Sequence, residues 1–189
     1  MAEPLVMDLV LQTERLILRR PVTGDAQAQI NVLNTAAVMA HVGGVKPLAA
    51  IEAKHAKARQ GFAQDGFGFM MMIERASGEL VGHCGMKRVD NPQARNPGDH
   101  EISWLVREDR WRRGYAAEAM RAVVEWAFVD IAAPHLVALT SQRNEPSRKL
   151  MEKLDMTRYA ALDFVDASYP PEDKLTIVYR LTPAQWAGA

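Results

Sequence analysis

The residues that could most clearly bind a ligand or take part in catalysis lie in the stretch 100–119, where an apolar run meets an arginine-rich turn. Glu101–Val106 is mostly apolar, as expected for a buried strand. Arg110–Arg113 then places three arginines around Trp111, and Gly114 precedes a segment with helical spacing. A helix N-terminus presents unpaired N–H groups and partial positive charge, and glycine lets an anion approach the backbone. The stretch therefore predicts an anion site, with phosphate as the expected ligand, between a strand and a helix.

The segment after Gly114 has an apolar side and a charged side, as an amphipathic helix does. The apolar side consists of Ala116, Met120, Val123, Val124, Ala127 and Phe128. The other side carries Glu118, Arg121 and Glu125, whose spacing allows ion pairs at i,i+3 and i,i+4. The spacing predicts one helix packed against a core.

This strand–turn–helix unit resembles the acetyl-CoA pyrophosphate loop of the GNAT acetyltransferase superfamily, whose pattern is Q/R-x-x-G-x-G/A. Trp111 stands at the first position instead of Gln or Arg, a departure common in the branch that includes the Rim-type ribosomal-protein N-acetyltransferases. Glu101–Val106 resembles the family's fourth strand, and the Thr-Glu-Arg-Leu of residues 13–16 opens many members of that branch. The resemblance implies that the loop holds the pyrophosphate of acetyl-CoA. The residues implied are Trp111, Arg112, Arg113, Gly114, Tyr115, Ala116 and Ala117.

A second motif lies further along the chain. Asn144-x-x-Ser147, followed by Glu-Lys-Leu-x-Met at 152–156, resembles the family's helix after its fifth strand. In the family this Asn bonds the pantetheine arm, and the Ser, or a Tyr further along, lies near the sulfur. Asn144 is equally suited to cap the helix, and the two roles are compatible. Asp155 stands where the family has Gly, so we expect it to adopt the left-handed backbone of a C′ residue.

Glu101 is the candidate base, because a carboxylate inside an apolar strand is costly to desolvate and needs a reason. The alternative is a structural salt bridge, and His100, on the opposite strand face, is the weaker candidate. The family resemblance implies that a base at this position acts through water. It also implies that a backbone N–H of Leu105 or Val106 binds the thioester carbonyl.

The reaction implied by the resemblance is acyl transfer from a thioester to an amine. An ammonium cannot attack, and an α-amino group, with a pKa of about 7.7–8.0, loses its proton far more easily than a lysine side chain at about 10.4. The Ser147 hydroxyl could hydrogen-bond the departing thiolate. Arg112, Arg113 and Arg148 either meet phosphate charge or are solvated surface. The proposed course is direct attack in a ternary complex.

The remaining pattern predicts an α+β fold of the GNAT type. Its central mixed, mostly antiparallel sheet should splay between the fourth and fifth strands and be flanked by helices. Strands are expected at 13–20, 66–73, 79–89, 101–106, 135–140, 156–165 and 174–181. Helices are expected from 24 to 34, from 48 to 64, after Gly114 and from Asn144. The chain 1–189 reads as a single domain, with the resemblance covering about Thr13 to Leu181.

Composition narrows the function classes. Basic and acidic residues each number 23, giving a net charge of +0 that does not indicate a large nucleic-acid-binding face. Cys84 is the only cysteine, and it and the run Met70–Met72 are expected in the core. No zinc-ligand spacing is present, so no metal is expected. Met1–Leu11 resembles neither a signal peptide nor a membrane span, so a cytoplasmic protein with no membrane association is expected.

The sequence thus favours an N-acetyltransferase that takes acetyl-CoA as co-substrate and an amine as acceptor, as a monomer or homodimer. The acceptor could be a protein N-terminus or a small molecule. Its specificity should lie in three loops, 36–47, 90–98 and 165–174. A catalytically idle CoA-binding sensor is an alternative, which the presence of Asn144, Ser147 and Glu101 disfavours. A nucleotide-binding protein is another, and the absence of G-x-x-x-x-G-K-[ST] and of a first-strand G-x-G-x-x-G disfavours it.

Overall fold

The computed structural model of the protein describes residues 8–188. Residues 1–7 and 189 lie outside this part, and with them most of the segment Met1–Leu11, expected to be neither a signal peptide nor a membrane span. Across residues 8–188, none of the helices is both long enough and apolar enough to cross a bilayer.

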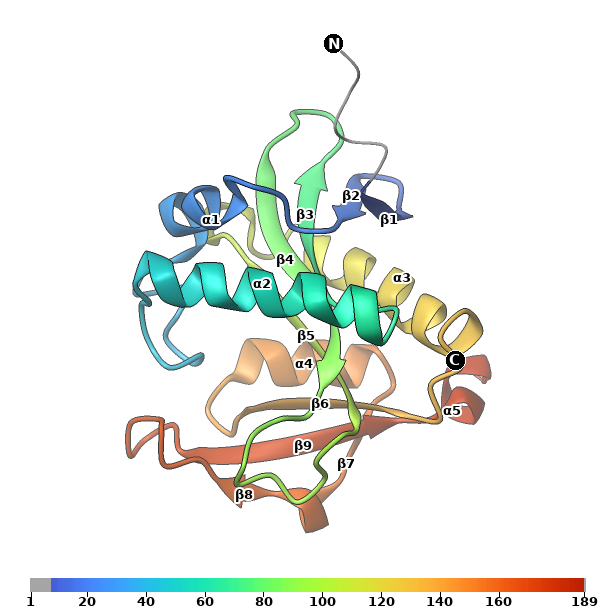
Figure 1. Ribbon diagram of the computed structural model, residues 1–189. Coiled ribbons are helices and arrows are strands. Elements are labelled where there is room, and N and C mark those ends of the chain that lie inside the picture. Colours follow the sequence, from blue (N-terminus) through green and yellow to red (C-terminus); the bar gives the residue numbers. More distant parts are fainter. Residues whose placement is uncertain (1–7, 189) are drawn as a thin grey trace.

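One mixed sheet forms the centre of the molecule (Figure 1). Its strands follow the order β1-β2-β3-β4-β5-β6-β9-β7, with β8 also paired to β9. The strands are β1 Leu9–Gln12, β2 Leu16–Arg19, β3 Phe69–Glu74, β4 Leu80–Arg88, β5 His100–Val106, β6 Leu136–Ser141, β7 Thr157–Arg158, β8 Phe164–Val165 and β9 Leu175–Leu181. Every pair within residues 8–188 is antiparallel except β5 with β6. The predicted fold class is therefore confirmed.

Helices cover both faces of this sheet. They are α1 Asp25–Leu33, α2 Leu48–Gln64, α3 Tyr115–Val129, α4 Glu145–Lys153 and α5 Pro183–Ala187, with short 3₁₀ turns at Glu108–Arg110 and Ala160–Leu162. In Figure 1, α2 crosses in front of the strands and α3 lies behind them. The prediction of a helix from 48 to 64 matches α2 at both ends.

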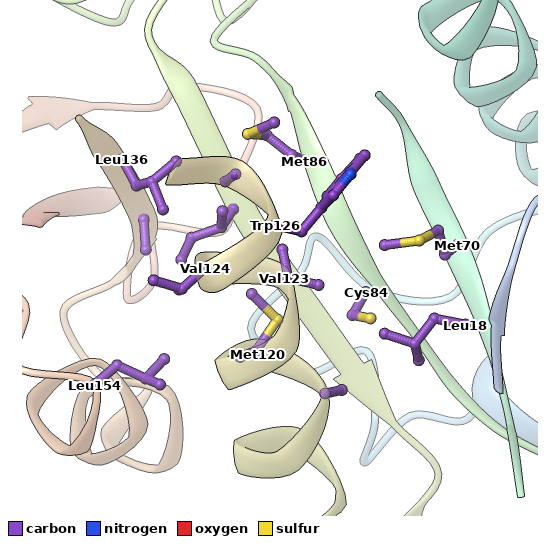
Figure 2. Packing of buried hydrophobic residues seen from close by; sticks show 14 of the residues in the cluster. Leu18, Met70, Cys84, Met86, Met120, Val123, Val124, Trp126, Leu136 and Leu154 are labelled. Atoms are coloured by element: carbon purple, nitrogen blue, oxygen red, sulfur yellow. The ribbon is translucent and has the colours of Figure 1, made fainter. Parts of the chain in front are cut away.

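The main core lies between α3 and the sheet, and strand alternation selects the side chains that enter it. Even-numbered residues of β3 and β4, such as Met70, Cys84 and Met86, face α3, as do Met120 and other apolar side chains of that helix (Figure 2). The buried residues of α3 are Tyr115, Ala119, Met120, Val123, Val124, Trp126 and Ala127. The predicted core positions of Cys84 and Met70–Met72 are confirmed, because all four side chains are buried.

The sheet opens between β5 and β6, as expected. These two parallel strands pair only at Glu101 and Val137, near the start of each strand. Beyond that point β6 pairs along its whole length with β9, and β5 pairs along its whole length with β4. The carboxyl ends of β5 and β6 therefore diverge and leave a V-shaped opening.

Three features depart from the sequence-based prediction. The N-terminal segment forms two strands, β1 and β2, joined by a tight turn at residues 13–15, instead of one strand from 13 to 20. The single strand predicted for 156–165 is wrong, because the 3₁₀ turn Ala160–Leu162 separates β7 from β8. Both short strands still pair with β9. A short helix, α5, follows β9 and begins with a capping box between Thr182 and Gln185.

Asp155 takes the left-handed conformation expected of it, with φ at 58°. Its side chain is exposed and makes no hydrogen bond with another residue of 8–188. We expect Asp155→Gly to raise the free energy of unfolding by about 0.5–1 kcal/mol, because glycine adopts this conformation without steric cost. Asp155→Val should lower it by about 1–2 kcal/mol. Denaturant unfolding of the variants checks this, and a destabilised Asp155→Gly would contradict it.

Candidate active site

The predicted anion loop lies at the carboxyl end of β5. Arg112 and Gly114 both have left-handed backbones, with φ at 59° and 83°, and α3 begins at the next residue. Their conformations turn successive N–H groups toward the same side. None of the backbone N–H groups of residues 112–117 has a hydrogen-bond acceptor among residues 8–188. Six consecutive free donors at a helix N-terminus are an arrangement suited to a phosphate group.

Trp111 explains how the loop is joined to β5. Its indole Nε1 donates to the carbonyl oxygen of Val106 at 2.7 Å, and its backbone N–H donates to Glu108. The side chain thus binds the last carbonyl of the strand and is itself 44% exposed. Trp111 therefore acts as a brace between strand and loop, and the N–H groups available to a ligand begin at Arg112.

The register of β4 and β5 decides which backbone N–H groups face the opening. Arg107 donates its N–H to the carbonyl of Val81, so residues 107 and 81 form a hydrogen-bonded pair. In an antiparallel ladder such pairs alternate, which directs the Leu105 N–H toward β4. The N–H groups of Trp104 and Val106 then point toward β6, where pairing has ended. Of the two predicted donors, the geometry favours Val106.

Asn144 and Ser147 lie on the opposite arm of the opening, at the carboxyl end of β6. The Asn144 side chain accepts from the Ser147 N–H at 3.3 Å and donates to the Thr140 hydroxyl at 2.9 Å. The capping role is therefore confirmed, and the cap fixes both side chains relative to β6. The Ser147 hydroxyl has no hydrogen-bond partner within residues 8–188. Arg148 donates to the Gln142 carbonyl at 3.0 Å, whereas the side chains of Arg112 and Arg113 extend into solvent.

A cavity of about 630 Å³ lies on the other face of the sheet, under α1 and α2. Strand alternation directs the side chains of Glu101, Ser103 and Leu105 into it, beside His83 and Lys87 of β4. The neighbouring wall comes from Leu139, Thr140 and Ser141 of β6. The phosphate loop does not line this cavity. The opening between β5 and β6 therefore has the predicted anion loop at one end and borders a separate cavity.

The three loops expected to set specificity, 36–47, 90–98 and 165–174, all contribute to the wall of the cavity. Polar contacts between side chains connect the third loop to the other two. Asn91 donates to the Asp166 carboxylate at 2.6 Å, joining the second loop to the third. The His41 Nδ1 lies 2.9 Å from the Asp173 carboxylate, joining the first loop to the third. Ser141 of β6 donates to the same carboxylate at 2.5 Å. These contacts hold the cavity rim against the sheet.

Glu101 lies in the cavity wall at the closed end of the opening. Its side chain is only 12% exposed, and the Lys87 Nζ lies 3.2 Å from its carboxylate. Burial raises the pKa of Glu101 above its ordinary value, although the charge of Lys87 opposes the shift. Burial also disfavours the Lys87 ammonium, yet Glu101 and Asp90 keep its pKa above the usual value. A carboxylate with a raised pKa that faces a cavity is suited to accept a proton.

Arg15 is a site residue whose role sequence reasoning missed. Its Nη1 donates to the Arg113 carbonyl at 2.9 Å, and its Nε donates to Glu118 at 2.6 Å. The guanidinium also stacks 4.4 Å from the Tyr115 ring centroid. The expected pairing of Glu118 within its own helix is wrong, because Thr13 and Arg15 engage that carboxylate instead. Arg15 therefore holds the predicted anion loop in shape from the β1–β2 turn, about 100 residues away in the sequence.

Comparisons with known proteins indicate the family of this chain. The model of the acetyltransferase (GNAT) domain family matches residues 15–157. The uncharacterized N-acetyltransferase YoaA of Bacillus subtilis (strain 168) is 28% identical over 157 residues, covering 81% of this chain and 85% of that protein. The uncharacterized N-acetyltransferase p20 of Bacillus licheniformis is 25% identical over 91 residues, covering 48% of this chain and 49% of p20. The match thus spans about half the length of that relative.

Solved structures show the same fold. An acetyltransferase from Agrobacterium tumefaciens str. C58 superposes with a TM-score of 0.74 at 29% identity, covering 90% of this chain and 92% of the other. A protein of Vibrio cholerae, provisionally named a ribosomal-protein-serine acetyltransferase, superposes with a TM-score of 0.70 at 19% identity. That alignment covers 93% of this chain and 97% of the other.

The Arg15 brace can be tested on ligand affinity. Arg15→Lys keeps the charge but loses the fork that binds Glu118 and the Arg113 carbonyl, so the loop N–H groups lose their alignment. We expect the Kd for CoA to rise about tenfold. The loss of affinity should not be larger, because the Arg15 side chain is partly exposed to solvent. Affinity for pantetheine, which lacks the pyrophosphate, should not change. Calorimetric titration measures both.

Arg75→Lys is the matched control, because Arg75 binds the carbonyls of Thr13 and Glu14 in the same segment without reaching the loop. Equal losses in the two variants would show that the segment, and not the Arg15 brace, controls binding.

Proposed function

The chain belongs to the GNAT acetyltransferase family, and we propose that it transfers an acetyl group from acetyl-CoA to a primary amine by direct attack in a ternary complex. The observation that carries this proposal is the opening between β5 and β6, with six free N–H groups at its mouth and Glu101 at its closed end. The distance between the loop and Glu101 is about 16–17 Å of extended strand. This length matches the span from pyrophosphate to thioester.

The donor would be held by backbone groups. The N–H groups of residues 112–117 would bind the pyrophosphate, and the pantetheine arm would lie in the opening, where Asn144 can reach it. The N–H groups of Trp104 and Val106 face this opening and would bind the thioester carbonyl. They would also stabilise the negative charge that develops on that oxygen during attack. The Leu105 side chain, directed into the cavity, would contact the acetyl end from the other side.

The amine must lose a proton before its nitrogen can form a bond with the acetyl carbon. Glu101 would accept this proton through a water molecule, and Lys87 would keep the carboxylate in place. As the carbon–sulfur bond breaks, CoA leaves as a thiolate. The free hydroxyl of Ser147, fixed by the Asn144 cap, would hydrogen-bond this sulfur.

The acceptor would enter the cavity under α1 and α2, next to Glu101. A protein N-terminus is one candidate, supported by the Trp at position 111, by the Thr-Glu-Arg-Leu of residues 13–16 and by the likeness to the Vibrio cholerae protein. A small-molecule amine is the other. Thiol release from acetyl-CoA, measured across a panel of amines and N-terminal peptides with mass spectrometry of the products, tests the proposal. No release with any amine, despite CoA binding, would favour an idle CoA-binding module.

Gly114→Val tests the phosphate loop. A β-branched side chain strains a backbone with φ at 83°, and its Cβ would lie 3.3 Å from the Arg15 Nη2. It would also occupy space that a phosphate needs. We expect the Kd for CoA to rise by about tenfold or more, since charge-assisted hydrogen bonds are lost. Gly24→Val is the matched control, because Gly24 is the N-cap of α1 with φ at 95° and free space around it. A folded Gly114→Val variant with unchanged affinity would refute the assignment.

Glu101→Gln tests the base, because it keeps the shape of the side chain and removes the proton acceptor. CoA affinity should not change, and kcat should fall by up to about 100-fold, the low end for general base catalysis if the acceptor is an α-amine. Part of the rate should return as rising pH deprotonates the amine. Equal activity of variant and parent at every pH would leave Glu101 as a structural charge.

The pH profile of the parent enzyme offers an independent check. The base works only when ionised, so kcat/KM should fall as pH drops through the raised pKa of Glu101. Lys87 lowers that pKa, so Lys87→Met should move the acidic limb of the profile to higher pH. An acidic limb that stays in place in a folded Lys87→Met variant would assign it to another group.

A further inference from the structure

Most charged side chains in the cavity wall neutralise one another. Lys57 pairs with Asp90, and Lys87 pairs with both Asp90 and Glu101. Arg88 lies 3.7 Å from Asp65. Each of these cations therefore has its own carboxylate and is not free to select a ligand.

Lys54 is the exception in this wall. It lies on α2 and lines the cavity, yet no carboxylate of residues 8–188 lies within 4.0 Å of its ammonium. The residue keeps substantial exposure, so its ammonium is only partly desolvated by the cavity wall. This partial burial lowers the pKa of Lys54, and the positive charges of Lys46 and Lys87 lower it further. The Lys54 ammonium therefore has two other cations nearby, and a bound anion would stabilise its charged form.

His83 supplies a second polar group without a partner. It lines the cavity from β4, and its Nδ1 is buried with no hydrogen-bond partner within residues 8–188. Burial, with the charges of Lys54 and His55, lowers its pKa to about 3, so the ring is neutral near pH 7. A neutral imidazole has one N–H to donate, and a buried polar atom without a partner is uncommon in native proteins. Its edge-on contact with Phe69, at 5.9 Å between ring centroids, helps fix the ring.

Lys54 shares the cavity wall with His83, Lys87 and Glu101. Its charge affects the pKa of His83, and the charge of Lys87, the partner of Glu101, affects the pKa of Lys54 in turn. His83 and Lys87 are four residues apart on β4, which corresponds to about 13–14 Å of strand. A ligand that reaches from Glu101 to Lys54 and His83 must therefore extend over several bonds.

We propose that the acceptor amine carries a carboxylate several bonds away, which binds between the Lys54 ammonium and the His83 N–H while the amine faces Glu101. This inference rests on the proposed acetyl transfer and names the acceptor class for the same site. Two sources supply this chemistry: a peptide N-terminus with an acidic side chain in its first residues, and a free ω-amino acid. An α-amino acid, whose two groups share one carbon, is too short to span the cavity.

Matched acceptors test the proposal. Thiol release from acetyl-CoA is measured with peptides that carry glutamate or glutamine at the second position, and with 6-aminohexanoate or its amide. We expect kcat/KM to be about tenfold higher for the acid in at least one pair, and this preference to shrink as salt rises. The pair that shows the preference identifies the source of the carboxylate.

Variants then locate the contact. Lys54→Gln should remove the preference and leave rates with the neutral acceptors unchanged. Lys149→Gln, which removes an exposed lysine paired with Glu145 on α4, should retain it. Because the Nδ1 is enclosed, the Nε2 is the ring nitrogen that can reach a ligand. His83→Gln keeps a donor near the Nε2 position and should retain most of the preference, whereas His83→Leu should lose it.

The outcomes separate the two proposals. Equal rates within both pairs for the parent enzyme would overturn the carboxylate site and leave acetyl transfer intact. A preference that survives Lys54→Gln would also overturn it. If no amine releases thiol, the proposed function fails, and equilibrium dialysis still decides the site: the acids, and not their amides, should bind the parent protein more tightly than Lys54→Gln.

Discussion

A single bridge between two parallel strands determines the geometry of this molecule. β5 and β6 are held together at Glu101 and Val137 and nowhere beyond. Parallel pairing could continue along both strands, but here each strand instead completes its ladder on its far side, with β4 and β9. Backbone donors on the open edge of β5 therefore lack a protein partner, and such groups are costly to bury unless water or a ligand binds them. The opening is thus a fixed feature between two well-paired half-sheets.

The two half-sheets stay in position because α3 packs against both. Its residues Met120 and Val123 meet the β3–β4 side, and Val124 and Ala127 belong to the same core as Leu136 of β6 (Figure 2). The start of this helix is also the proposed phosphate loop, so core packing and the proposed anion site share one element. Arg15 connects the β1–β2 turn to the first turn of the helix through its ion pair with Glu118. Displacing α3 would change the loop and the opening together.

The sequence predicted those features that depend on interactions between neighbouring residues. The bounds of α2, the Asn144 cap and the left-handed Asp155 all follow from residues close together in the chain. The pairing of Glu118 does not, because Arg15, in the distant β1–β2 turn, supplies a 2.6 Å contact and a backbone N–H as well. Together these outweigh an exposed i,i+3 pair. The choice between Leu105 and Val106 also needed the register with β4, which the sequence does not specify.

The alternation of β5 has a consequence for the proposed reaction. Along a strand, the edge to which each N–H points alternates with residue number, and so does the face that each side chain occupies. In β5 the N–H groups of Trp104 and Val106 point into the opening, while the side chains of Glu101 and Ser103 enter the cavity. One strand therefore presents backbone N–H groups to acetyl-CoA, the proposed acetyl donor, and side chains to the proposed acceptor amine. Because both sets belong to the same rigid strand, their separation is fixed by the backbone, and the amine and the thioester can meet without rearrangement of the sheet.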